Sequence, residues 1–182
     1  QSDFERVFDS EYGRQVGVTL LSQYRMAPNI GDLVSSCFYD ERLETGRGSP
    51  PPYYEHLPGE LSQQVTWVDM STLGGRGHHQ QSEDGSDTWN KAEAKVVMHI
   101  LRQIVESEEF MSELLPALKP QEPAIGIICM YDKQREIIDQ MKSEAAWLGD
   151  HRHLVKIDTV DSYQGKENRI VILSTVRNHP SG

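Results

Sequence analysis

Apolar residues in the second half of the chain recur at helical spacing in two segments, residues 90–107 and 133–148. A repeat of about 3.6 residues predicts amphipathic helices with one buried face. The predicted buried faces consist of Val97, Ile100, Leu101, Ile104 and Val105 in the first helix and Ile137, Ile138, Met141 and Leu148 in the second. Asn90 is a suitable N-cap for the first helix, with Glu93 three residues later.

Shorter apolar or β-branched runs predict strands. They lie at residues 16–20, 64–70, 124–130, 154–158 and 169–176. The continuous apolar run at 124–130 is typical of a strand buried on both faces of a parallel sheet, and we expect 169–176 to be another central strand. Because strands alternate with helices, the sequence predicts βαβ units and a three-layer α/β fold with a mainly parallel sheet.

Residues 45–89 interrupt this pattern. They are rich in Gly, Pro, Ser and His and show no period apart from the short run at 64–70. Such a composition is typical of surface loops or partly disordered segments. We therefore expect one domain over residues 1–182 with a loop-rich insertion at 45–89.

Composition narrows the class of protein. The chain has 182 residues, 37% of them hydrophobic and 25% charged, which is typical of one soluble globular domain. It has no apolar run of about 18 residues and no signal-peptide core near its start, so we expect neither membrane insertion nor secretion. Cys37 and Cys129 lie far apart in apolar sequence, as expected of reduced thiols, which favours an intracellular protein, either cytoplasmic or nuclear.

The charge distribution limits where nucleic acid would bind. A formal net charge of -10 argues against a protein whose task is to coat nucleic acid. Residues 41–90 are acidic, with three Lys/Arg against eight Asp/Glu, whereas residues 131–182 are locally neutral, with eight of each. We expect any phosphate contact in the second of these segments and consider the acidic first segment as a docking surface for a protein partner.

Three polar stretches follow predicted strands, at residues 22–28, 129–135 and 159–167. Ligands of open parallel sheets collect at the carboxyl ends of the strands, so the three stretches form one candidate constellation. In the first, Tyr24 offers an aromatic face for a base and Arg25 a guanidinium for phosphate oxygens. The alternative is that Tyr24 packs at a helix start and Arg25 forms a surface ion pair.

The stretch at 159–167 contains a second candidate pair. Gly165 allows backbone N–H groups to approach a phosphate, and Glu167 can accept hydrogen bonds from ribose hydroxyls. Taken alone, a glycine-containing loop before a strand is usually only a turn.

The order and spacing of four segments resemble a known family. "LLSQYRMAPNIGDLVSSCFYDERL", "NKAEAKVV", "IGIICMYDKQREII" and "IDTVDSYQGKENRIVILSTVRN" are similar to the second RecA-like domain of superfamily 1 helicases of the nonsense-mediated-decay and DNA-replication-nuclease type. The similarity runs over residues 16–178, with 45–88 unmatched. The Gln-Tyr-Arg-Met and Val-Asp-Ser-x-Gln-Gly-x-Glu motifs are its most specific parts.

The resemblance implies an ATP site with named residues. Tyr24 would stack on adenine, and Arg25, as the catalytic residue, would reach the γ-phosphate of ATP held by a first RecA-like domain. Gln23 would position this turn. Gly165 would approach the γ-phosphate through its backbone, and Glu167 would contact the ribose.

The resemblance also implies single-stranded RNA or DNA as a partner. Tyr131 and Thr159 would face the nucleic-acid backbone, through contacts that do not depend on base sequence. Most relatives have Thr-Pro-Tyr where this chain has Cys129-Met130-Tyr131, so the resemblance does not extend to the threonine hydroxyl contact there.

Other parts of the family pattern are missing from the chain. It contains no G-x-x-x-x-G-K-[ST] phosphate loop and no Asp-Glu pair for Mg²⁺, so the resemblance places the Mg²⁺ ligands of bound ATP on a first RecA-like domain outside this sequence. The sequence also ends before the family's arginine finger, and we expect Arg177 to lie at the sheet edge instead. These gaps predict a fragment that does not hydrolyse ATP alone.

Two other candidate sites are weaker. His78 and His79 lie in a polar loop without a cysteine beside them, so we expect a solvated loop and no metal site. Cys129 lacks an identifiable activating base and fits the core better than a nucleophile.

Two functions remain at this stage. The first is the C-terminal motor domain of an ATP-dependent helicase or translocase, contributing to the ATP cleft and the single-strand track. The alternative is a catalytically degenerate, helicase-like interaction module that docks a protein through residues 41–90.

Overall fold

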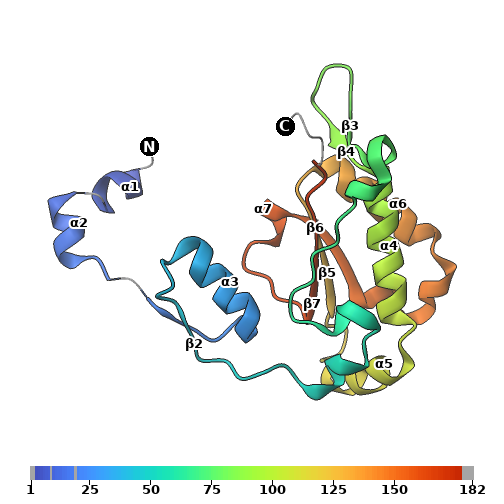
Figure 1. The fold of residues 1–182 in the computed structure, drawn as a ribbon, viewed down its shortest axis with the longest axis horizontal. Coiled ribbons are helices and arrows are strands. Elements are labelled where there is room, and N and C mark those ends of the chain that lie inside the picture. The colour runs from blue at the N-terminus through green and yellow to red at the C-terminus, as the bar shows by residue number, and fades with distance from the viewer. Residues whose placement is uncertain (1–2, 9, 19, 178–182) are drawn as a thin grey trace. The chain divides into compact units, whose positions relative to one another are not determined.

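The computed structural model describes residues 3–8, 10–18 and 20–177 (Figure 1). The chain forms two compact units, within residues 1–51 and 52–182, and each is treated by itself. No helix in the described ranges is both long and apolar enough to cross a membrane.

The first unit is mainly helical with one small strand pair. Its elements are α1 (Asp3–Phe8), α2 (Glu11–Val16), β1 (Ser22–Gln23), α3 (Pro28–Phe38) and β2 (Glu44–Thr45). β1 and β2 are parallel, with Ser22 opposite Glu44. α3 starts at Pro28, whose fixed φ suits the first turn of a helix and whose missing N–H would have no partner there.

The strand predicted at residues 16–20 is wrong. Val16 ends α2, and Gly17, Val18 and Leu20 are in no strand, while Thr19 lies outside the described residues. Val18 and Leu20 are 82% and 83% exposed, and no strand among the described residues pairs with them. A β-branched run becomes a strand only where a neighbour accepts its backbone hydrogen bonds and covers its side chains.

The second unit is an α/β domain, which confirms the predicted fold class. Its elements are η1 (Pro52–His56), η2 (Gly59–Ser62), η3 (Ser71–Gly77), β3 (Gln80–Gln81), β4 (Thr88–Trp89), α4 (Lys91–Val105), α5 (Glu108–Leu114), η4 (Leu115–Ala117), β5 (Ile125–Cys129), α6 (Asp132–Glu144), η5 (Ala146–Leu154), β6 (Val155–Thr159), α7 (Val160–Tyr163) and β7 (Ile170–Ser174). The main sheet has the order β6-β5-β7 with all strands parallel, and β3 and β4 form a separate antiparallel pair.

The two faces of the main sheet are covered differently. Ile125, Ile127 and Cys129 alternate along β5 and are fully buried in the core that α4 and α6 complete. Gly126, between the first two, faces the other side, where Tyr163 of α7 lies against it. Figure 1 shows α4 and α6 on one side of the strands and α7 on the other.

The prediction that 169–176 forms a central strand is wrong in position. The strand exists as β7, but β5 is the central strand and β7 pairs only with β5 among the described residues. Val171 and Leu173 are 49% and 53% exposed, alternating with the better covered Ile170 and Ile172. Its apolar run therefore has a covered face and an open face.

The two predicted helices are present with different ends. α4 begins after Asn90, whose side chain accepts a hydrogen bond from Glu93 N at 3.0 Å, as the capping pattern predicts. α6 ends at Glu144, earlier than predicted. Arg152 donates to the carbonyl oxygens of Lys142 and Ala145, and so satisfies carbonyl groups that the end of a helix leaves open. Leu148 is buried, but in η5.

The segment at 45–89 is only partly a surface loop. Tyr53 and Leu57 are buried, and the ring centroids of Tyr53 and Phe110 lie 5.7 Å apart, so η1 is packed against α5. The strand predicted at 64–70 is wrong. Trp67 there is 82% exposed, and without a partner strand or a buried face the alternation of apolar residues does not produce a strand.

Candidate nucleotide and nucleic-acid sites

The turn at Gln23–Met26 is held by the side chain of its first residue. Gln23 Oε1 accepts hydrogen bonds from Arg25 N at 2.9 Å and Met26 N at 2.7 Å. Gln23 Nε2 donates to the Met26 carbonyl at 3.2 Å and to Thr45 Oγ1 at 2.8 Å. These contacts are what a turn-positioning role for Gln23 requires, and its role toward ATP stays a prediction.

This turn presents Tyr24 and Arg25 to solvent. Tyr24 is 73% exposed, and one side of its ring lies against Gly46, where an added Cβ would come within 2.3 Å of a ring carbon. Arg25 is exposed, and its carbonyl accepts a hydrogen bond from the Arg47 guanidinium. An open aromatic face and a guanidinium on one fixed turn are suited to stacking a base and binding a phosphate.

Tyr131 and Thr159 lie at the same edge of the main sheet. Cys129 is opposite Thr159 in the register of β5 and β6, and Tyr131 follows Cys129 by two residues. Tyr131 is the N-cap of α6, and the Arg177 guanidinium carbon lies 5.6 Å from its ring centroid. Thr159 is the N-cap of α7, and its Oγ1 donates to Ser162 Oγ at 3.2 Å.

Gly165 and Glu167 lie in the connection from α7 to β7. Gly165 has φ +81°, a conformation that glycine adopts without a Cβ penalty. The connection is fixed at both sides, since the Tyr163 hydroxyl donates to Asn168 Oδ1 and Asn168 Nδ2 donates to the Pro123 carbonyl. The end of the connection therefore lies beside Pro123, at the amino end of β5, whereas Thr159 lies at the carboxyl edge.

The predicted ATP residues thus form two groups. Gln23, Tyr24 and Arg25 belong to the first unit, and Gly165 and Glu167 to the second. Each group is ordered by contacts within its own unit.

A cluster of charged side chains lies beside the Gly165 loop. Asp158 accepts a hydrogen bond from Lys166 Nζ at 2.8 Å, and Lys156 Nζ lies 3.6 Å from the same carboxylate oxygen. The hydrogen bond to Asp158 raises the pKa of Lys166 above its ordinary value, so this lysine is charged at neutral pH. Burial, followed by the charge of Asp158, raises the pKa of Tyr163.

A buried polar network behind the carboxyl edge was missed by the sequence analysis. Gln134 is fully buried, and its Oε1 accepts from Asn90 N at 2.8 Å. Gln134 Nε2 donates to the Asn90 carbonyl at 3.2 Å and to Ser174 Oγ at 3.1 Å. Ser174 Oγ in turn donates to Glu93 Oε1 at 2.7 Å. The network joins the starts of α4 and α6 to the end of β7.

One sequence signal points to this network. Gln134 lies four residues before Ile138 and so belongs to the apolar stripe of its helix, where a polar side chain needs hydrogen-bond partners. Asn90 caps α4 as expected, but the Glu93 carboxylate does not bond back to Asn90 N, which donates to Gln134 Oε1 instead. The Glu93 carboxylate accepts from Ser174 Oγ and Val176 N, contacts that the capping pattern does not predict.

Cys129 behaves as a core residue. It is fully buried, and burial together with the negative charge of Glu93 raises the pKa of its thiol to about 12.

Among the residues that the structure describes, no group of three or more His, Cys, Asp or Glu side chains is arranged to hold a metal ion.

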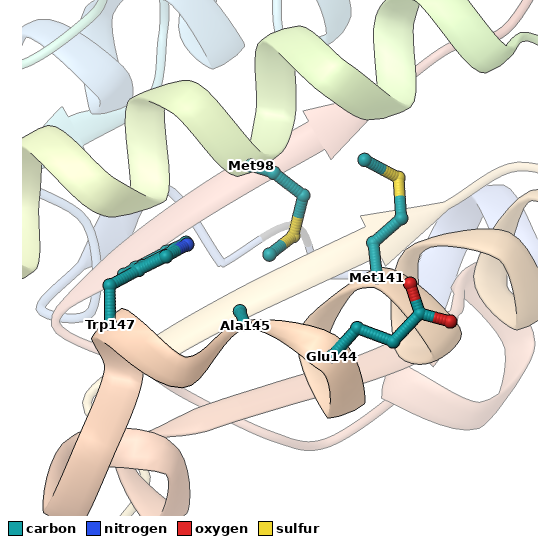
Figure 2. A pocket seen from close by; sticks show the side chains of 5 residues that line it. All are labelled: Met98, Met141, Glu144, Ala145 and Trp147. Atoms are coloured by element: carbon teal, nitrogen blue, oxygen red, sulfur yellow. The ribbon is translucent and has the colours of Figure 1, made fainter.

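A shallow hollow lies beside α4 near the end of α6. It is lined by Met98, Met141, Glu144, Ala145 and Trp147, and Figure 2 shows the two thioether side chains within it. Glu144 is its single charged lining residue. Convergent polar groups fix the orientation of a nucleotide, and this hollow does not offer them.

Comparison with known proteins identifies the family. A sequence profile of the AAA domain family matches residues 1–182. The chain belongs to this family and, by its relatives, to the superfamily 1 helicases of the nonsense-mediated-decay and DNA-replication-nuclease type.

Three relatives illustrate the similarity. The chain is 30% identical over 182 residues to the helicase required for RNAi-mediated heterochromatin assembly 1 of Schizosaccharomyces pombe. It is 26% identical over 178 residues to the ATP-dependent helicase NAM7 of Saccharomyces cerevisiae and 27% identical over 181 residues to the DNA replication ATP-dependent helicase/nuclease DNA2 of Gallus gallus. The matches cover 98%, 97% and 98% of this chain but 15%, 17% and 15% of the respective relatives.

Proposed function

We propose that the chain is the second RecA-like motor domain of an ATP-dependent superfamily 1 helicase or translocase. It contributes one wall of an ATP cleft and one half of a single-strand track, and it does not hydrolyse ATP alone. Membership of the helicase family supports this assignment, and the relatives are several times longer than the chain.

The observation that carries the proposal is the turn at Gln23–Met26. Four hydrogen bonds from one side chain fix it, while Tyr24 keeps 73% of its surface exposed beside Arg25. Because the backbone of the turn is fixed, it presents the exposed Tyr24 ring and Arg25 from one defined position, which suits a ligand site.

On the nucleotide side, each residue has a limited task. Tyr24 stacks on the adenine, and the Arg25 guanidinium binds γ-phosphate oxygens and stabilises the charge that develops during transfer. Gly165 brings its backbone N–H to the same phosphate, and Glu167 accepts from the ribose. The Mg²⁺ ligands of the bound ATP would lie on a first RecA-like domain outside this sequence.

On the nucleic-acid side, Tyr131 and Thr159 bind the strand across the carboxyl edge of the main sheet. Contacts of this kind are made to phosphates and base faces and so tolerate any sequence, RNA or DNA. Closure of the two RecA-like domains on ATP and their release after hydrolysis would move the strand stepwise.

The test is nucleic-acid-stimulated ATPase activity of this chain beside that of the longest natural product of its gene. We expect activity only in the longer protein. Activity of the short chain would contradict its role as a half-site, and silence of both folded proteins would contradict the motor.

The second candidate is an interaction module. It is favoured by the acidic segment 41–90, where Trp67 is 82% exposed with Val65 and Val68 beside it, both 46% exposed. Silence of both proteins in the ATPase assay, together with a partner lost on Trp67→Ala substitution, would support it.

A further inference from the structure

The turn after β7 has a strained backbone at a buried residue. Val176 has φ +72°, in the left-handed region where a β-branched residue is an outlier, and its side chain is fully buried. Such a conformation persists only where the surroundings fix it, and it is found preferentially at functional sites.

Two residues at the start of α4 fix Val176 by both of its backbone polar groups. The Glu93 carboxylate accepts from Val176 N at 3.1 and 3.0 Å, and also from Ser174 Oγ at 2.7 Å. Asn90 Nδ2 donates to the Val176 carbonyl at 3.2 Å. A carboxylate is well suited here, because hydrogen bonds to a charged acceptor are stronger than neutral ones.

The residue that follows the strained one is Arg177. Its guanidinium carbon lies 5.6 Å from the centroid of the Tyr131 ring, at the edge where Thr159 also lies. A guanidinium on an aromatic face keeps its N–H edges available for phosphate oxygens while the ring accepts a base.

We propose that Glu93 is a positioning residue for nucleic-acid binding: it holds the turn after β7 so that Arg177 binds a backbone phosphate beside Tyr131. This inference rests on the proposed function. It adds to that function one phosphate-binding residue and the carboxylate that orients it.

Two helix N-termini contribute partial positive charge at this edge. They belong to α4 and α6, of 15 and 13 residues. Two carboxylates also lie here and are held by hydrogen bonds, since Glu93 binds the turn and Asp132 Oδ1 accepts from Arg135 Nε at 2.7 Å.

The experiment measures binding of a fluorescein-labelled oligothymidylate to the full-length protein by fluorescence anisotropy at several salt concentrations. Arg177→Ala should weaken binding about tenfold and reduce the slope of log affinity against log salt by about 0.7, the value for one lost phosphate contact on a single strand. Arg177→Lys keeps the charge and should restore most of the slope.

Glu93→Gln tests the positioning role. Its amide keeps the size of the side chain but offers one acceptor oxygen where the carboxylate offers two, so binding should weaken by the same mechanism as in Arg177→Ala. If Glu93 acts through Arg177, the double variant should bind no more weakly than Arg177→Ala alone. A role in stability alone would leave binding by the folded Glu93→Gln variant unchanged, and a contribution to binding that is independent of Arg177 would give additive losses.

Arg102→Ala is the matched control. Arg102 is also stacked on an aromatic ring, with its guanidinium carbon 5.8 Å from the Trp147 centroid, and it lies on α4 farther from the helix start than Glu93. Its substitution should leave the salt slope unchanged. Urea unfolding of each variant identifies any that fails to fold, and Arg177→Ala, at an exposed position, then carries the test alone.

Three results would overturn the proposal. An unchanged salt slope in Arg177→Ala would show that Arg177 binds no phosphate. Additive losses in the double variant would show that Glu93 does not act through Arg177. A wild-type protein that binds neither oligothymidylate nor oligouridylate contradicts the proposed function itself, which distinguishes that failure from the other two.

Discussion

Two turns in this molecule present an arginine, and they are held in different ways. The Gln23–Met26 turn is held by its own first residue, with one further contact to Thr45. The turn after β7 is held by Glu93 and Asn90, which are more than 80 positions away in the sequence.

This contrast shows where sequence motifs are informative. A turn held by its own residues carries its support inside the motif, so the motif and its geometry are recognised together. A turn held from another helix shows in sequence only the residues that it presents. The residues that support it lie elsewhere in the sequence. Here they are Asn90 and Glu93, which in the sequence read as a helix-capping pattern.

Among substitutions in the first turn, Arg25→Ala should have the largest effect on ATP turnover. In the full-length protein, loss of the guanidinium at the γ-phosphate should lower kcat for ATP about 10³-fold. Because Gln23 bonds only to the backbone of residue 25, the turn should keep its shape, and the circular dichroism spectrum should not change. Arg42→Ala, at an exposed position, is the control, and turnover equal to wild type in Arg25→Ala would remove Arg25 from the site.

Glu93→Ala should give the largest effect on the second turn. It leaves Val176 N and Ser174 Oγ without their acceptor and should reduce the free energy of unfolding by about 3 kcal/mol. Urea unfolding of the 182-residue chain measures it. Glu106→Ala, which removes an exposed pair with Arg102 on the same helix, should change stability by about 0.5 kcal/mol or less. Equal small losses of stability in Glu93→Ala and Glu106→Ala would show that the turn after β7 does not depend on Glu93.

The pH dependence of the free energy of unfolding should depend on the buried Cys129 and not on the exposed Cys37. The folded pKa of Cys129 is about 12, whereas an unfolded thiol titrates near about 8.5. Above about pH 9 the unfolded chain therefore loses a proton that the folded chain keeps, and stability should fall by about 1.4 kcal/mol per pH unit. Below about pH 8 both states hold the proton and the contribution is constant.

The measurement compares wild type with Cys129→Ala by urea unfolding between about pH 8 and about pH 10. The alanine variant should lack this part of the slope, while Cys37→Ala, at an exposed cysteine in α3 of the first unit, should retain it. Parallel pH profiles in all three proteins would contradict the burial of the Cys129 thiol.

Gln23→Ala should give the smallest and most local effect. The amide N–H groups of Arg25 and Met26 lose their acceptor, and because the site is partly exposed the opening free energy of the turn should fall by about 1 kcal/mol. Hydrogen exchange at these two amides should accelerate, with no change in α4 or β5. Faster exchange throughout the chain would mean that the turn is not an independent local structure.

The sequence predicted best those elements whose pattern and environment agree. Most of the positions that periodicity selects in α4 and β5 are buried, with Ile100 partly covered, and Asn90 caps α4 as expected. The runs at 16–20 and 64–70 failed because strand propensity needs a partner strand that local sequence does not reveal.

The candidate site shows the same limit. The register of β5 and β6 brings Tyr131 and Thr159 to one edge, as expected for polar residues that follow parallel strands. The network of Gln134, Glu93 and Ser174 was not predicted, because its members lie on three elements and the local sequence around each does not show which partners it meets. Only the tertiary structure shows that they share hydrogen bonds.

The left-handed conformation of Val176 restricts how this protein can change over evolutionary time. Glycine or asparagine at position 176 would adopt φ +72° at little cost, and the carboxylate at position 93 would then be free to vary. While valine is retained, loss of Glu93 should be selected against even where the ATP residues are intact. Homologues are therefore expected to covary at these two positions, with a carboxylate at 93 wherever 176 is β-branched.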